Sequence, residues 1–174
     1  MTSFEFTLVI EGDAGTDARI DALFDAGCDD ATFSHGRTTS YGDFAREADG
    51  LLAAVLSAVR DVESVEGLRV RRVDEFDLVT VAEIADRLGR TRQSVNQLIA
   101  GDRGGGSFPL PLGSTRGHGR VWSWSEVAAW AEVDHDVERA TVLAAVNGAL
   151  ALRRAASLLG SVELQRLIDV AVAA

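Results

Sequence analysis

The chain has 174 residues, of which 47% are hydrophobic, so it can bury a core in one domain or in two small ones. Its net charge of -10 argues against a polyanionic partner unless the charge is unevenly distributed. No stretch reaches the ~18 consecutive apolar residues that cross a bilayer, and the first residues lack the basic start of a secretory leader. We therefore expect a cytoplasmic protein with no membrane partner.

The negative charge is concentrated in the first part of the chain. Residues 1–76 carry 16 Asp and Glu against 7 Arg, a net charge of -9, whereas residues 77–131 carry 5 against 6 and residues 132–174 carry 6 against 4. Only the middle segment, with a net charge of +1, escapes the acidity. All 17 basic residues are Arg, which pairs bidentately with phosphate and guanine, and the lack of Lys excludes a P-loop or a Schiff-base enzyme.

The sequence suggests neither a metal site nor a catalytic centre. Cys28 is the only cysteine, so an internal disulfide is impossible, and the three histidines, His35, His118 and His135, are widely scattered. No nucleophile and base stand at a recognisable spacing. We expect a protein that is not an enzyme and that has no cofactor.

The first segment, residues 1–76, has the pattern of a small α/β domain. Alternating apolar residues predict a strand over 4–10, and a helical stripe that ends before Gly27 predicts a helix to about Ala26; the stripe consists of Ile20, Leu23 and Phe24. Further elements are predicted in the order strand 31–34, strand 38–44, helix 52–62 and strand 68–73. This βαββαβ order predicts a ferredoxin-like domain, a plan that hosts many functions.

The second segment, residues 77–131, begins with two short helices joined by a tight turn. Thr80 and Glu83 have the spacing of a capping box, and Gly89 suits the end of the first helix. Thr91 can cap a second helix that buries Val95, Leu98 and Ile99 and stops at Gly101. The pattern predicts a helix-turn-helix.

A glycine-rich stretch and a predicted β-hairpin follow the second helix. Phe108, Leu110, Leu112, Val121 and Trp122 can build this hairpin, a candidate wing. Ser123 and Glu126 form a second capping box, which predicts another helix to about Ala131. The tryptophans Trp122, Trp124 and Trp130 are expected to pack the core of this small domain.

Three motifs in this segment resemble a known family. They are VTVAEIADRLGRTRQSVNQLIAG, FPLP and RVWSWSEVAAWAE. Together they resemble the winged helix-turn-helix of excisionase and AlpA-type prophage regulators, which is related to the MerR DNA-binding domain. The resemblance covers about a third of the chain. It implies double-stranded DNA as a partner and, as one variant, an excisionase-like factor that bends DNA.

The predicted second helix supplies the best candidate contacts with DNA. In a helix-turn-helix the second helix enters the major groove, where side chains can distinguish base edges. With its apolar side turned to the core, the helix presents Arg92, Gln93, Asn96 and Gln97. Arg90 and Thr91 stand where a helix N-terminus can meet a phosphate. The loops and the wing add Arg103, Arg116, His118 and Arg120, which could reach the backbone or the minor groove.

The third segment, residues 132–174, predicts a helical hairpin divided at Gly160. Much of VLAAVNGALALRRAASLLG is apolar around the helix, so it must be covered by other segments or by a second copy of the chain. We expect a homodimer.

The whole chain is thus predicted to be an α+β protein that acts as a sequence-specific, DNA-binding transcriptional regulator. The alternative is a protein-interaction module, such as an antitoxin or adaptor, whose acidic N-terminal domain neutralises a basic protein partner. Exposed polar side chains on a single helix are also typical of a surface that contacts only solvent. The prediction of DNA contact therefore depends on the preceding helix and on the wing.

Overall fold

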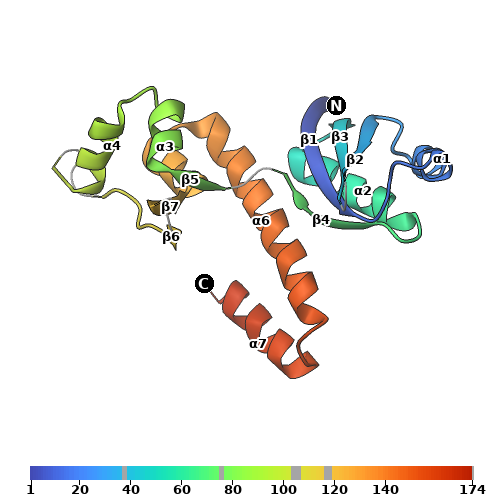
Figure 1. Ribbon diagram of the computed structural model, residues 1–174. Coiled ribbons are helices and arrows are strands. Elements are labelled where there is room, and N and C mark those ends of the chain that lie inside the picture. The colour runs from blue at the N-terminus through green and yellow to red at the C-terminus, as the bar shows by residue number, and fades with distance from the viewer. Residues whose placement is uncertain (37–38, 75–76, 103–106, 116–118, 174) are drawn as a thin grey trace. The chain divides into compact units, whose positions relative to one another are not determined.

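The computed structural model describes residues 1–36, 39–74, 77–102, 107–115 and 119–173 (Figure 1). Over these ranges the chain is an α+β protein with two antiparallel sheets. It forms two compact units, which are unit 1 (1–74 and 145–174) and unit 2 (75–144). The predicted third segment is divided between them, because helix α6 (Asp134–Ala156) contributes to both.

The sheet of unit 1 contains four antiparallel strands in the order β2-β3-β1-β4. Its elements follow one another as the sequence predicted: β1 (Thr2–Glu11), α1 (Asp17–Asp25), β2 (Ala31–His35), β3 (Ser40–Ala48), α2 (Leu51–Ser64) and β4 (Arg69–Val73). The two central strands pair over the whole of β3, from Thr2 opposite Ala48 to Ile10 opposite Ser40. The first and last strands of the βαββαβ series, β1 and β4, therefore lie side by side.

The core of unit 1 lies between this sheet and its helices. Leu8 and Ile10 are fully buried, and the ring of Phe6 stacks on that of Phe44 with centroids 5.4 Å apart. The prediction that the apolar stripes of α1 and α2 face the core is only partly confirmed. Leu23 of α1 is buried, but Phe24 is 63% exposed, and Leu52 and Leu56 of α2 are also exposed.

A buried guanidinium joins three elements of unit 1. Arg46 of β3 is 7% exposed and donates hydrogen bonds to Asp30 at 2.7 Å, to Asp61 of α2 at 2.6 Å and to the carbonyl of Gly27 at 2.7 Å. These charge-assisted bonds, those to Asp30 first, raise the pKa of Arg46 above its ordinary value. Arg46 therefore stays charged and holds the turn after α1 against α2.

The C-terminal half of α6 covers the open edge of β4. The Asn147 side chain accepts a hydrogen bond from the Val73 amide at 2.8 Å and donates one to the Val73 carbonyl at 3.2 Å. One turn and a half later, Arg153 donates to the Val70 carbonyl at 2.9 Å while it pairs with Glu63. Backbone groups that an edge strand would otherwise offer to another chain are thereby satisfied.

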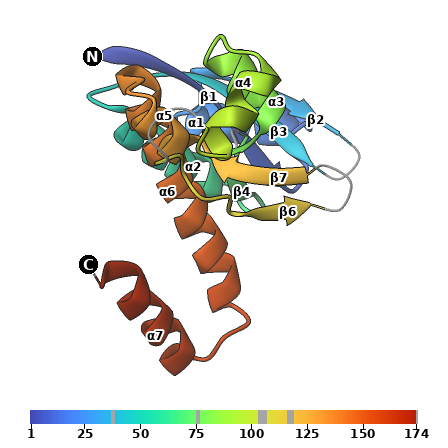
Figure 2. The ribbon, with the colours of Figure 1, turned by 90° about the vertical axis from the view of Figure 1, so that its left-hand side faces the viewer.

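The described residues of unit 2 form three short strands, three short helices and the N-terminal part of α6. The short strands and helices are β5 (Leu78–Thr80), α3 (Val81–Arg87), α4 (Arg92–Ile99), β6 (Gly113–Thr115), β7 (Gly119–Ser123) and α5 (Trp124–Trp130). The sheet order is β5-β7-β6, and Figure 2 shows β6 and β7 side by side as a hairpin. The core gathers residues from almost every element: Val79, Ile84, Ala85, Val95, Trp122, Trp124, Val127 and Ala128.

The helix starts of unit 2 follow the predicted caps. Thr80 accepts a hydrogen bond from the Glu83 amide, and Glu83 accepts one from the Thr80 amide, so the capping box is confirmed. Ser123 accepts a bond from the Glu126 amide, which is one of the two bonds of the second predicted capping box; the return bond to the Glu126 side chain is not formed among the described residues. Asp77 adds what the sequence did not reveal, because its carboxylate accepts from the Ser123 hydroxyl at 2.5 Å and from the Ser125 amide at 2.7 Å.

The chain ends in helix α7 (Ser161–Val172), which follows α6 after a short turn. Gly160 caps α7, in agreement with the predicted division of two helices. None of the residues of α7 is buried. In the part of the chain that is described, no helix combines the length and the apolar character that crossing a bilayer requires.

Candidate nucleic-acid interface

The surface of helix α4 is set by which of its sides the core of unit 2 covers. Val95 is fully buried and Leu98 is 4% exposed, so the helix is fixed by its apolar side. Arg92, Gln93 and Asn96 are exposed, as predicted, whereas Gln97 is half-buried. The side chains left outside are a guanidinium and two amides, the chemical types that pair with guanine, adenine and phosphate.

The start of α4 is shaped by a tight turn from α3. Gly89 adopts a φ of 60°, which favours glycine, and the Arg90 amide donates to the Ala85 carbonyl at 2.8 Å. Thr91 is the N-cap and accepts from the Ser94 amide at 3.1 Å. The first amides of a helix have no partner within it, so this end presents free N–H groups and a partial positive charge beside the exposed Arg90.

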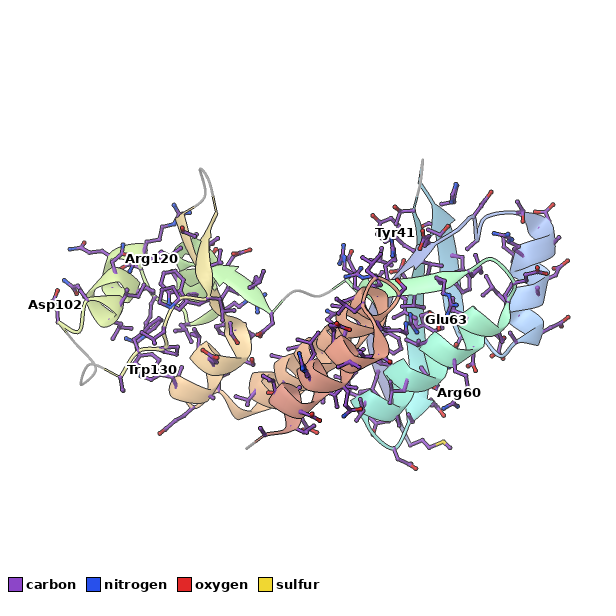
Figure 3. The ribbon with its side chains drawn as sticks, turned by 90° about the horizontal axis from the view of Figure 1, so that it is seen from below. Tyr41, Arg60, Glu63, Asp102, Arg120 and Trp130 are labelled. Carbon is purple, nitrogen blue, oxygen red and sulfur yellow. The ribbon has the colours of Figure 1, made fainter. Side chains whose placement is uncertain are left out.

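The β6–β7 hairpin carries one described candidate residue. Arg120 of β7, labelled in Figure 3, is exposed. Its guanidinium lies over the Trp122 ring, 5.4 Å from the centroid. This stacking orders a long side chain on the hairpin. The other predicted contacts in the loops, Arg103, Arg116 and His118, lie outside the described residues.

The hairpin is shorter than the sequence suggested. The Leu112 amide donates to the Val121 carbonyl of β7 at 2.9 Å, so Leu112 extends the hairpin as predicted. Leu110 lies before β6 and is 81% exposed, so the prediction that it builds the hairpin was wrong. Phe108 instead packs edge-on against Trp122 and Trp130, with centroids 6.3 Å and 4.9 Å away. Phe108 therefore packs against the core of unit 2.

Arg87 is a cationic residue that sequence reasoning missed. It ends α3, and its guanidinium lies 4.8 Å from the centroid of the Trp124 ring. It also lines a hollow of about 420 Å³ together with Arg90 and residues at the end of α5; the full lining is Arg87, Leu88, Arg90, Trp130, Ala131, Glu132 and Val133. The sequence signal that could have identified Arg87 is its position, as a basic residue in the last helical turn before Gly89.

The hydrogen bonds of the capping box at the start of α3 favour the ionised form of Glu83. Hydrogen bonds from the amide and the hydroxyl of Thr80 lower the pKa of Glu83 below its ordinary value, and Arg87 acts in the same direction. The carboxylate therefore remains ionised at neutral pH, at the N-terminal end of α3 where a negative charge is favourable.

A serine, a histidine and an aspartate come together in unit 1, a grouping that the sequence did not suggest. The His35 Nδ1 atom lies 2.8 Å from the Ser40 hydroxyl and 3.5 Å from the Asp13 carboxylate. A nucleophilic triad uses the two ring nitrogens for these two partners, whereas here both lie at Nδ1. Ser40 is fully buried and donates to the Gly12 carbonyl, so it anchors a loop.

Among the described residues, no three His, Cys, Asp or Glu side chains are arranged to hold a metal ion. Comparisons of the chain with protein-family models, with curated proteins and with solved structures give no significant match. The geometry of the surface around α4 is therefore the basis for any statement about function.

Proposed function

We propose that the chain is a sequence-specific transcriptional regulator that binds double-stranded DNA through a winged helix-turn-helix in unit 2. Helix α4 would lie in the major groove, and the β6–β7 hairpin would act as the wing against the backbone or the minor groove. Unit 1 would be a ferredoxin-like domain, a proposal supported by the β2-β3-β1-β4 strand order.

The observation that carries the proposal is the division of α4 into two sides. Val95 and Leu98 are buried, and this leaves Arg92 and Asn96 together on the exposed side, one turn apart. A rigid helix with a guanidinium and an amide on its outer side offers donors at fixed positions for base edges. The capped N-terminus with Arg90 supplies the phosphate contact that sets the register of such a helix.

The charge distribution supports the same surface. Residues 1–74 of unit 1 carry 15 Asp and Glu against 7 Arg and repel phosphate. Unit 2 as a whole carries 10 against 7, but its residues 77–131, which include α4 and the hairpin, carry 5 against 6. DNA binding would therefore be restricted to unit 2, and the chain as a whole would bind DNA with a modest dependence on salt.

The experiment is a selection of bound fragments from the genome that encodes the chain, repeated at two salt concentrations. We expect a shared motif that survives the higher salt concentration, because base contacts do not depend on counterion release. The double variant Arg92→Ala, Asn96→Ala should lose the motif. Fragments without a common motif, or the same motif with the double variant, would refute the proposal.

A second candidate function is a protein-interaction role of unit 1, and helix α1 favours it. Asp17, Asp21 and Asp25 follow one another at four-residue spacing, and Ile20 and Phe24 beside them are 41% and 63% exposed. Such a surface suits a basic partner protein with an apolar contact. Co-purification from the native host with wild type and with Phe24→Asp tests this role, and an identical set of bound proteins would count against it.

A further inference from the structure

Unit 1 contains an apolar groove that its own chain leaves open. The groove lies between α2 and the C-terminal half of α6 and has a volume of about 250 Å³. Its lining is entirely aliphatic: Leu52, Leu56, Val59, Ala145, Val146, Ala149 and Leu150. Leu52 and Leu56 are each 47% exposed. An exposed hollow of this composition marks a contact surface more often than a solvated one.

Helix α7 presents a second apolar surface without a cover. Leu164, Leu167, Ile168 and Ala171 have the i, i+3, i+4, i+7 spacing of a single stripe. Leu167 is 44% exposed and Ile168 is 36% exposed. A helix of 12 residues is marginal in water by itself, so it gains most of its stability from packing this stripe against something.

The two surfaces match in length and in the charges beside them. The stripe runs from Leu164 to Ala171 and the α2 side of the groove from Leu52 to Val59, and each extends about 10 Å along its helix. Arg60 stands one turn after Leu56, and Glu163 stands one turn before Leu167. Each apolar surface therefore has an exposed charge beside it, and the two charges have opposite sign.

The turn between α6 and α7 keeps α7 away from the groove of its own chain. The Leu158 and Leu159 amides both donate to the Ala155 carbonyl, at 2.9 and 3.1 Å, and the Ser157 hydroxyl donates to the Arg154 carbonyl. These bonds fix the direction in which the chain leaves α6. The lining of the groove comes from α2 and α6 and includes no residue of α7, so α7 does not fill it.

We propose that the groove receives α7 of a second copy, so that the chain forms a two-fold dimer by exchanging its C-terminal helices. Each copy has one groove and one α7, and a two-fold axis fills both grooves at once and leaves neither stripe exposed. The inference rests on unit 1 alone and goes beyond the proposed function, since it holds whether or not unit 2 binds DNA.

Cysteine cross-linking of the full chain distinguishes a second copy from the chain's own α7. One chain carries Leu56→Cys and a second, mass-tagged chain carries Leu167→Cys, so that a disulfide between the two can form only between copies. The native Cys28 does not compete, because it is 2% exposed and burial raises the pKa of its thiol to about 11. We expect the mixed disulfide to be the main oxidation product.

The double variant Leu56→Cys, Leu167→Cys in one chain gives the contrasting result. The two-fold exchange predicts a dimer closed by two disulfides, whereas a monomer with an internal disulfide would show that α7 closes its own groove and would overturn the proposal. A mixture of the single variants that forms no cross-link would also overturn it, and a different partner would then fill the groove.

The oligomeric state in solution gives an independent readout by light scattering across a dilution series. We expect a dimer for the wild type, and a rise of about a hundredfold or more in its dissociation constant for Leu56→Asp and for Leu167→Asp, because each places a carboxylate in an apolar contact. Leu110→Asp is the matched control, an 81% exposed leucine of unit 2 that should leave the dimer unchanged. A monomeric wild type would contradict the exchange, and so would a dimer that remains intact in both Leu56→Asp and Leu167→Asp.

Discussion

Helices α4 and α7 are both short and amphipathic, yet they expose opposite sides. In α4 the apolar residues Val95 and Leu98 are buried, and the polar side faces outward. In α7 no residue is buried, and the apolar stripe with Leu167 remains exposed. If each helix binds through the side that it leaves uncovered, as we propose, the contacts of α4 would be polar and directional and those of α7 apolar.

The first prediction joins the two helices and has the largest expected effect. If α7 holds the dimer and α4 reads DNA, Leu167→Asp should weaken binding to a site with two half-sites by about 10² to 10⁴-fold, because the second half-site is no longer bound within the same molecule. Binding to a single half-site should be unchanged. Fluorescence anisotropy measures the affinity for each of the two DNAs. An equal loss of affinity for the single and the double half-site would show that the dimer formed through α7 does not contribute to DNA binding.

A matched pair of Leu→Ala substitutions sharpens the comparison of burial. Leu98→Ala should lower the free energy of unfolding of unit 2 by about 2 to 5 kcal/mol, because Leu98 is 4% exposed and its removal leaves a cavity. Leu167→Ala should change stability by less than about 0.5 kcal/mol in dilute, monomeric protein. Tryptophan fluorescence in denaturant reports unit 2, since all three tryptophans lie there. Similar losses for both variants would remove the distinction between the helices.

Arg92→Ala tests whether the polar side of α4 reads sequence. If Arg92 contacts a guanine, its loss should cost about 1 to 3 kcal/mol of binding free energy and relax the preference at one base position. The readout is affinity for a panel of single-base variants of the selected site. An equal loss on every sequence would assign Arg92 to a phosphate. Gln97→Ala, at a half-buried position, is expected to have a smaller effect.

The smallest effect concerns the helix that supports α4. The pKa of Glu83 is lowered in the folded chain, so its contribution to stability is fully present above its unfolded pKa and is lost as the pH falls through the folded value. The wild type should therefore lose stability below about pH 4.5 relative to Glu83→Gln, which keeps the capping oxygen without the charge. Parallel pH profiles of unfolding for the two proteins would contradict this role.

Local signals in the sequence predicted the elements of unit 2 well. The spacing of Thr80 and Glu83 and the positions of Gly89 and Thr91 define α3, the turn and α4 through hydrogen bonds between residues at most five apart. The exposure of Arg92, Gln93 and Asn96 followed from the same periodicity, whereas Gln97, also predicted to be exposed, is half-buried. The βαββαβ order of unit 1 was also predictable, because each strand and helix has its own apolar repeat.

Features that depend on contacts between distant residues were not predictable. Strand β5 has three residues, too few for a pattern, and exists because it pairs with β7 some 40 residues later. The side chains of Asp77 and Asn147 reach partners 46 and 74 residues away in the chain. The exposure of Leu52 and Leu56 depends on how α6 packs, so a stripe that looked like core became a groove.

The most direct test of the central claim is the affinity of the full chain for its selected DNA, with and without the exposed side chains of α4. The double variant Arg92→Ala, Asn96→Ala should bind at least about thirtyfold more weakly than wild type, from two lost contacts of about 1 kcal/mol or more each. Arg69→Ala, at a 68% exposed residue of strand β4 in unit 1, should bind as wild type does. Equal affinities for the double variant and the wild type would show that α4 does not bind DNA.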